Sequence, residues 1–358
     1  MLPLHAARTI VVFRALMLGD LLCATPALRA LRAAAPGARI ALCGLPWTAE
    51  LAGRLPSVDE FIEFPGHSAL PERTPAPGAL EQFVDAMRQR RFDLALQMHG
   101  SGGTVNPLVE SLGALATAGF ATPTTAAGLD LAVPWSEHGT EIERCLSLTD
   151  ALGAARAGLH LDLPLTAGDR AELARLRATH GMAGRYAIVH PGSQLPSRRW
   201  SPERFAWVAD ALVEAGLSVV LTGSAAEAPL TAAVSRFCRR PVLDLAGATR
   251  SIWALGALVE AAALVIANDT GISHIAAALG TRSVIVASGS DVPRWAPLDR
   301  RLHRVHWHAT PCRPCAHAVC PTSHECAAGV AAAPVIATAL ELLEGELPCP
   351  TPLAACAS

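Results

Sequence analysis

Acidic, hydroxyl and small side chains follow a short apolar run in the last third of the sequence. The run, residues 263–266, is typical of a buried strand, and the chemistry-bearing residues after it are Asp269, Thr270, Gly271 and His274. A strand that gives way to a helix here places a carboxylate, a hydroxyl and free backbone N–H groups at one point, and helix N-termini attract phosphate. We therefore expect a nucleotide-type ligand at this segment. The alternative is structural, with Asp269 and Thr270 as helix caps and His274 as a packed side chain.

A second carboxylate stands after the first strand-like run, residues 9–13. Arg14 follows this run directly, and Gly19 precedes Asp20. A carboxylate at a strand-to-helix turn, with no adjacent base to pair it, can serve as a general base toward a hydroxyl group. The alternative interpretation is that Asp20 caps the helix, because Asp is common at such positions.

Two further turns after strand-like runs carry groups that suit a phosphorylated ligand. The segment 190–200 contains Gly192, Ser193 and Arg198, so hydroxyls, backbone donors and a guanidinium could hold an anion. A solvated surface loop explains the same residues equally well. Glu227 follows another strand-like run, where a carboxylate could hold ribose hydroxyls, although a first-turn helix residue is the favoured interpretation.

Four cysteines toward the C-terminus form a local cluster with two interleaved histidines. The cluster consists of Cys312, Cys315, Cys320 and Cys326, with His317 and His324 between them. This spacing could wrap a zinc ion, but the second pair lacks the Cys-x2-Cys turn that makes zinc-ribbon sites specific. We expect reduced structural thiols here rather than a bound metal.

Short apolar runs alternate with helical patterns along both halves of the chain, which predicts an α/β fold with parallel sheets covered on both faces. We expect two Rossmann-like, doubly wound domains, at residues 1–165 and 185–343, joined by a connecting segment at 166–184 that contains one helix. Residues 283–287 would be the last strand and residues 344–358 a disordered tail. Ligands in such folds bind outside the carboxyl ends of the strands, where the residues singled out above stand.

The composition excludes several classes of function. The net charge of −2 provides no electrostatic footprint for nucleic acid. All 29 basic residues are arginine, so Schiff-base lysines, pyridoxal phosphate attachment and P-loops are excluded. No apolar run approaches the ~18 residues of a membrane span and the first residues lack a signal-peptide pattern, so we expect a cytoplasmic protein without a transmembrane segment.

In combination, these segments resemble glycosyltransferase family 9, the ADP-heptose:lipopolysaccharide heptosyltransferases. The resemblance covers about residues 9–343 and rests on four segments in a fixed order. They are 14–32 with Leu18-Gly19-Asp20, 190–200 with His190-Pro191-Gly192-Ser193, 245–249, and 268–274 with Asn268-Asp269-Thr270-Gly271. The resemblance implies the GT-B architecture, in which two Rossmann-like domains face each other across a cleft.

The resemblance also implies roles for individual residues. Asp20 matches the family's proposed catalytic base, which would deprotonate an acceptor hydroxyl for an inverting attack on the anomeric carbon. Arg198 stands where the family usually has a lysine, and it would neutralise the diphosphate. The remaining matches are Gly192, Ser193, Glu227, Asp269, Thr270, Gly271 and His274 on the donor side, and Arg14 and Gly19 on the acceptor side.

The function implied is transfer of a heptose from ADP-heptose to a lipopolysaccharide core or a related cell-envelope glycan. The chain has no Asp-x-Asp triplet, in agreement with an enzyme that needs neither a metal nor another cofactor. A lipid-linked acceptor would bring the enzyme to the inner face of the cytoplasmic membrane. Two alternatives stay open: a nicotinamide-dependent oxidoreductase, against which the incomplete glycine motif at 100–103 counts, and a catalytically silent nucleotide-sugar-binding protein.

Overall fold

Two parallel sheets of six strands form the framework of the computed structural model, which describes residues 4–345. The first has the order β3-β2-β1-β4-β5-β6 and the second the order β9-β8-β7-β10-β11-β12. The strands are β1 Thr9–Phe13, β2 Arg39–Gly44, β3 Glu60–Glu63, β4 Leu94–Gln97, β5 Ala116–Ala121, β6 Leu131–Pro134, β7 Tyr186–His190, β8 Ser218–Leu221, β9 Leu243–Asp244, β10 Leu264–Asn268, β11 Ser283–Ala287 and β12 His303–Trp307. The expected α/β class with two doubly wound parallel sheets is confirmed.

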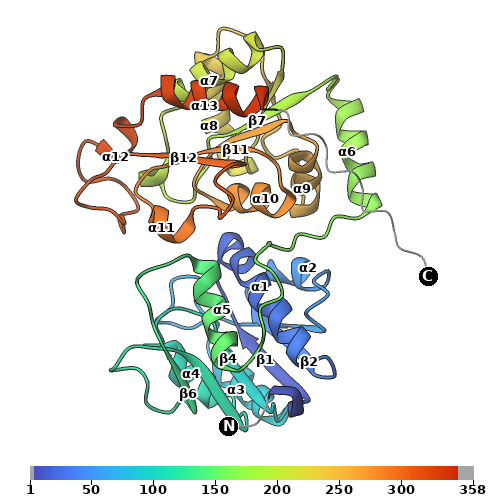
Figure 1. Cartoon of the computed structure of the whole chain (residues 1–358), viewed down its shortest axis with the longest axis vertical. Helices are drawn as coiled ribbons and strands as arrows, with labels where there is room; N and C mark the ends of the chain where they lie inside the picture. Colours follow the sequence, from blue (N-terminus) through green and yellow to red (C-terminus); the bar gives the residue numbers. More distant parts are fainter. Residues whose placement is uncertain (1–3, 346–358) are drawn as a thin grey trace. The chain divides into compact units, whose positions relative to one another are not determined.

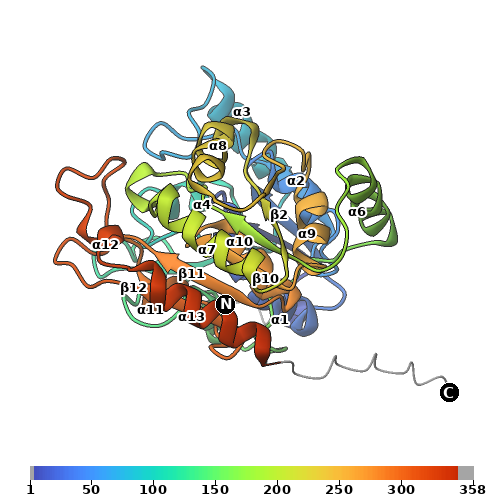
Figure 2. The same cartoon turned by 90° about the horizontal axis from the view of Figure 1, so that it is seen from above.

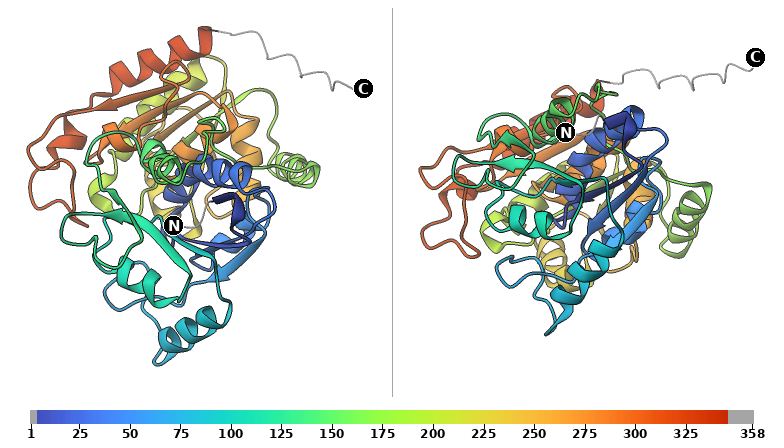
Figure 3. Two further views of the ribbon diagram at one scale, coloured as in Figure 1. Left: turned by 60° about the horizontal axis from the view of Figure 1, so that its bottom comes forward. Right: turned by 90° about the horizontal axis from the view of Figure 1, so that it is seen from below.

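Helices connect the strands and cover the sheets (Figure 1). They are α1 Leu18–Ala34, α2 Thr48–Ala52, α3 Ala79–Gln89, α4 Val105–Ser111, α5 Glu141–Ala151, α6 Ala167–Thr179, α7 Pro202–Glu214, α8 Ala228–Phe237, α9 Ile252–Glu260, α10 Gly271–Leu279, α11 Val292–Trp295, α12 Glu325–Ala328 and α13 Ala332–Glu344. In the first half α1 packs against α5 (Figure 3), and in the second α7 packs against α13 (Figure 2). The helix expected within 166–184 is α6.

The sequences of the central strands are continuous apolar runs, because helices cover both faces of each sheet. Residues 10–13 of β1 are completely buried, and on one face Val11 and Phe13 join a core cluster with Phe64. In the second sheet Ile266 of β10 belongs to a cluster that includes Trp200. These parallel strands pair in register, for example Val11 with Ala41 in β2 and with Ala95 in β4.

Both sheets have the same strand order when the strands of each half are counted from one, and this order defines where a ligand would bind. The order reverses between β1 and β4 in the first sheet and between β7 and β10 in the second. Ligands of doubly wound sheets bind in the crevice outside the carboxyl ends of the strands at such a reversal. The sequence-predicted residues Arg14, Asp20, Gly192 and Asp269 all follow one of these strands.

The chain forms two compact units, each of which is described by itself below. Unit 1 comprises Met1–Glu172, Asp269–Gly280 and Ser290–Leu298, so it contains the first sheet together with α10 and α11. Unit 2 comprises Leu173–Asn268, Thr281–Gly289 and Asp299–Ser358, and it contains the second sheet. The domain boundaries expected from the sequence stay predictions, and all but the first two residues of the expected tail at 344–358 lie outside the described residues.

Three strands, β5, β6 and β12, are not predicted by the sequence pattern. We expected 283–287 to be the last strand, but β12 follows it and pairs with it. The sequence of β12, His-Arg-Val-His-Trp, contains no apolar run, because an edge strand keeps one side in water. β5 and β6 also went unrecognised. Half of the residues in β5 are alanine, a residue type that is depleted in strands.

Within the described part of the chain, no helix combines the length and the hydrophobicity that crossing a membrane requires.

His99 follows β4 in a buried position and makes unfolding of unit 1 dependent on pH. Its ring lies 5.4 Å from that of Phe13, and burial lowers its pKa from 6.5 to about 4. Between pH 6.5 and 4 the unfolded chain therefore binds this proton more tightly than the folded chain, and stability falls as the pH drops. We expect the free energy of unfolding lost between pH 7 and pH 5 to shrink by about 2 kcal/mol in His99→Gln, measured by urea denaturation. The exposed His138→Gln control should leave this loss unchanged, and equal losses in wild type and His99→Gln would contradict the assignment.

Candidate functional site

Arg14 is buried and ties the end of β1 to the start of α1. Its Nε donates to the main-chain oxygen of Asp20 at 2.8 Å, and its Nη1 donates to the main-chain oxygen of Met98, just after β4. Asp20 is the third residue of α1, and its Oδ2 accepts the Met17 N–H at 3.2 Å. The capping alternative is therefore realised at Asp20. Within the described residues, its second carboxylate oxygen has no hydrogen-bond partner.

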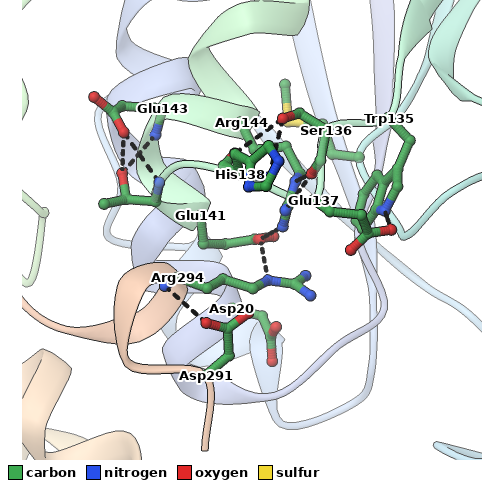
Figure 4. A network of polar contacts seen from close by, with 12 residues as sticks. Asp20, Trp135, Ser136, Glu137, His138, Glu141, Glu143, Arg144, Asp291 and Arg294 are labelled. Carbon is green, nitrogen blue, oxygen red and sulfur yellow. Dashed lines mark hydrogen bonds and ion pairs between the residues drawn. The ribbon is translucent and has the colours of Figure 1, made fainter. Parts of the chain in front are cut away.

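Glu141, the first residue of α5, is a buried carboxylate surrounded by guanidinium groups (Figure 4). Its Oε1 accepts a hydrogen bond from Arg14 Nη2 at 3.0 Å. Its Oε2 accepts from Arg144 Nη1 at 2.6 Å and from Arg294 Nε at 2.9 Å. The Arg14 and Glu141 side chains are only 1% and 4% exposed, so this pair is almost fully withdrawn from water. A buried carboxylate persists only where its partners satisfy it, as they do here.

The environment moves the pKa values of the two carboxyl groups in opposite directions. Burial is the largest cause of the raised pKa of Asp20, and the negative charge of Glu141 adds to it, whereas Arg14 and His274 lower it. Burial also acts to raise the pKa of Glu141, but Arg14, Arg294 and Arg144 together outweigh it, so that pKa is lowered. Of the two, Glu141 therefore holds its negative charge more strongly, and Asp20 is the carboxyl group that takes up a proton more readily.

The segment that follows β10 belongs to unit 1 and packs against α1. Thr270 occupies the N-cap position of α10 but makes no side-chain capping bond, so the capping alternative is not realised there. His274 is buried, with Nδ1 3.6 Å from Cys23 Sγ and its ring 6.1 Å from that of Trp295. Burial lowers the pKa of His274, which favours the neutral imidazole.

In unit 2 the side chain of Asn268 holds the loop after β7 in place. Its Nδ2 donates to the Pro191 main-chain oxygen at 2.8 Å, and its Oδ1 accepts the Trp200 N–H at 2.9 Å. Asn268 is completely buried, so these bonds form in a water-free site. The main-chain oxygen of Ser193 accepts from Arg199 Nε at 2.9 Å. The predicted phosphate loop is therefore ordered by Asn268 of β10 and by its own Arg199.

Arg198 lies in this ordered loop, within the 3₁₀ turn Pro196–Arg198. Its Nη2 donates to the main-chain oxygen of Cys315 at 3.2 Å, while its buried Nε has no partner within residues 4–345. The neighbouring Ser197 donates to the main-chain oxygen of His317. The cysteine segment is thus bonded to the loop through its backbone. Among the described residues, no group of three or more His, Cys, Asp or Glu side chains could hold a metal ion.

Glu227 caps the 3₁₀ turn Ala225–Glu227 after β8. Its Oε2 accepts hydrogen bonds from the Ser224 N–H at 2.8 Å and from the Ser224 hydroxyl at 2.9 Å. The favoured structural interpretation of Glu227 is therefore confirmed. A Cβ at Gly192 would lie 2.2 Å from Glu227 Oε1, so the carboxylate rests directly on a glycine that leaves room for it.

The structure brings the sequence-predicted residues together in two sets. Unit 1 holds Arg14, Gly19, Asp20, Asp269, Thr270, Gly271 and His274, and unit 2 holds Gly192, Ser193, Arg198 and Glu227. Within unit 1 the contact is close, because a Cβ at Gly19 would lie 2.6 Å from His274 Cδ2. The chemical roles assigned to these residues stay predictions.

Four residues of the Glu141 network were missed: Glu141, Arg144, Arg294 and Trp135. A local signal existed for the first two, because Thr140 and Glu143 form a capping box that starts α5 with Glu141 inside it. Nothing in the sequence around Arg294 indicated that it would meet a glutamate 153 positions earlier.

Comparison with known families matches this chain to a family of transferases. The model of "Glycosyltransferase family 9 (heptosyltransferase)" matches residues 81–325, more than half of the chain.

Two curated relatives are lipopolysaccharide heptosyltransferases. Lipopolysaccharide heptosyltransferase 2 of Salmonella typhimurium is 27% identical over 300 residues, which are 78% of this chain and 82% of the relative. Lipopolysaccharide heptosyltransferase 3 of Escherichia coli is 31% identical over 169 residues. This second match covers 46% of this chain and about half, 49%, of the relative.

Two solved structures share the fold. The glycosyl transferase family 9 structure from Veillonella parvula has a TM-score of 0.79 at 20% identity and covers 95% of this chain and 98% of that one. The Escherichia coli ADP-heptose lps heptosyltransferase II has a TM-score of 0.71 at 21% identity and covers 94% and 98%. These likenesses confirm the expected GT-B fold class.

The contact between Gly19 and His274 leads to a stability prediction. An added methyl group at position 19 overlaps the imidazole, so Gly19→Ala should lower the free energy of unfolding by about 1–3 kcal/mol. Gly37→Ala is the matched control, because a Cβ there meets nothing within 4 Å. Urea denaturation of both variants checks this, and equal stability of Gly19→Ala and Gly37→Ala would show that the ring is not held against α1.

Proposed function

Because this chain belongs to glycosyltransferase family 9, we propose that it transfers a heptose from ADP-heptose to a lipopolysaccharide core acceptor. In this proposal the transfer inverts the anomeric centre, needs no metal, and uses Asp20 as the general base. The names of the relatives, lipopolysaccharide heptosyltransferases of two enteric bacteria, support the sugar and the acceptor. Membership of a transferase family favours a transferase over the two alternative functions, the oxidoreductase and the catalytically silent binding protein.

The observation that carries the base assignment is the environment of Asp20. A general base needs an accessible oxygen and a pKa close enough to neutral to accept a proton. Asp20 is partly exposed, one of its oxygens is uncommitted within the described residues, and burial raises its pKa. Glu141 has neither property, because its oxygens are bonded to guanidinium groups and its pKa is lowered.

On the donor side, the departing diphosphate requires positive charge and N–H donors. Arg198 supports this part of the proposal, because its buried Nε has no hydrogen-bond partner among the described residues. Glu227, Asp269 and His274 would contact the ribose and phosphates, and Gly192 and Ser193 would offer backbone donors.

Arg14 and Gly19 would shape the acceptor side. A lipid-linked acceptor would place the enzyme at the inner face of the cytoplasmic membrane.

Replacement of the proposed base separates chemistry from binding. Asp20→Asn keeps the size of the side chain and removes the proton acceptor, so the rate of heptose transfer should fall by about 10²–10⁴. ADP affinity, measured by isothermal titration calorimetry, should stay within about threefold of wild type. The rate of wild-type transfer should rise with pH through the raised pKa of Asp20, giving an acidic limb at a higher pH than an ordinary aspartate would give.

The matched control is Asp85→Asn, a carboxylate on α3 that is 70% exposed. It should transfer heptose at the wild-type rate. Near-normal transfer by Asp20→Asn would refute the base assignment while leaving the family intact.

Loss of the Arg198 guanidinium should weaken donor binding. Arg198→Gln removes a charged donor from the loop, so the dissociation constant for ADP should rise about 10- to 100-fold. Arg236→Gln, an exposed arginine on α8, is the control and should bind ADP as wild type does. Calorimetric titration of both variants gives the answer, and unchanged affinity in Arg198→Gln would remove this residue from the donor site.

A further inference from the structure

Arg294 is an arginine whose orientation is set on three sides. Its Nε donates to Glu141 at 2.9 Å. Its guanidinium carbon lies 4.6 Å from the centre of the Trp295 ring and 5.4 Å from that of Trp135. Asp291 also accepts the Arg294 main-chain N–H at 3.4 Å. A planar guanidinium that contacts two aromatic rings and is fixed by a carboxylate has little freedom left to lose on binding.

The three guanidinium groups around Glu141 differ in how far their donors are used. All three nitrogens of the Arg14 guanidinium donate hydrogen bonds, to Asp20, Met98 and Glu141. The nitrogens of Arg144 donate to Glu141 and to the main-chain oxygen of Ser136.

Arg294 donates a side-chain hydrogen bond through Nε alone. Within residues 4–345 its two Nη groups have no hydrogen-bond partner, and the side chain is 25% exposed, so these donors are accessible.

The charge balance of the network also favours an anion. Three arginines face one glutamate, and Asp20 with its raised pKa compensates the excess only in part. Figure 4 shows the Arg294 guanidinium bonded to Glu141. A guanidinium with free parallel N–H groups in such a place matches the geometry of a phosphate or a carboxylate.

We propose that Arg294, aimed by Glu141 and by the rings of Trp135 and Trp295, binds an anionic oxygen of a substrate, a phosphate or a carboxylate. This inference rests on the proposed function only in naming the two substrates that could carry the anionic group. One is the diphosphate of the nucleotide donor, and the other is an anionic substituent of the acceptor glycan.

Three titrations of Arg294→Gln and wild type decide between the sources. Inorganic pyrophosphate and ADP are titrated by calorimetry, and the KM for a truncated lipopolysaccharide core is measured in the transfer assay. If Arg294 binds the donor, the dissociation constants of pyrophosphate and ADP rise about 10- to 100-fold. If it binds the acceptor, those constants stay unchanged and the acceptor KM rises by this factor, while kcat stays within about threefold. Arg294→Lys keeps the charge but not the fork, and should lose part of this affinity.

The control is Arg156→Gln, an arginine that is 44% exposed and pairs with Asp150 of α5. It should equal wild type in all three titrations. Values within threefold of wild type for Arg294→Gln in every titration would overturn the inference. If wild type transfers no heptose, the proposed function fails, and calorimetric binding of pyrophosphate and of the truncated core then decides: a raised dissociation constant for either in Arg294→Gln supports the anion site, and equal constants for both overturn it.

Discussion

The buried ion pair between Glu141 and Arg14 holds the carboxyl edge of the first sheet in one arrangement. Arg14 reaches the main chain after β1 and after β4, which are the two strands at the reversal of strand order. Glu141 brings α5 to the same point. Removal of Glu141 would leave the Arg14 charge buried without its ion-pair partner, at a cost of about 3–5 kcal/mol. The position of Asp20 therefore depends on a charge balance as well as on packing.

Capping and proposed chemistry coincide in the same side chains. Asp20 and Glu227 both accept a backbone N–H at the start of a helical segment, as their structural interpretations required. A cap of this kind is strongest when the carboxylate is ionised, and a general base must also be ionised before it takes a proton. The two roles make the same demand on the side chain, so a capping contact does not argue against a catalytic one.

The sequence predicted the parts of the fold that depend on local pattern. The apolar runs at β1, β7 and β10 are recognisable because both faces of these strands are buried, and the turns behind them could be located to the residue. β5 and β12 could not be found, since alanine and histidine carry no strand signal. The partnership of Glu141 with Arg294 was also beyond reach, because only the tertiary fold brings them together. A buried charged residue cannot be recognised from the sequence until the residues that pair with it are known.

Unit 1 is assembled from segments that are far apart in the chain, and this has a consequence for biosynthesis. The ribosome finishes all six strands of the first sheet well before it reaches α10 and α11, which complete the same unit. A nascent chain can therefore form the first sheet as a unit. Until residue 274 is added, however, His274 is absent from the side of Gly19. Until residue 294 is added, Glu141 has only two of its three guanidinium partners. The surroundings of Asp20 are thus completed late in translation, so a half-made chain carries the carboxylate without the environment that tunes it.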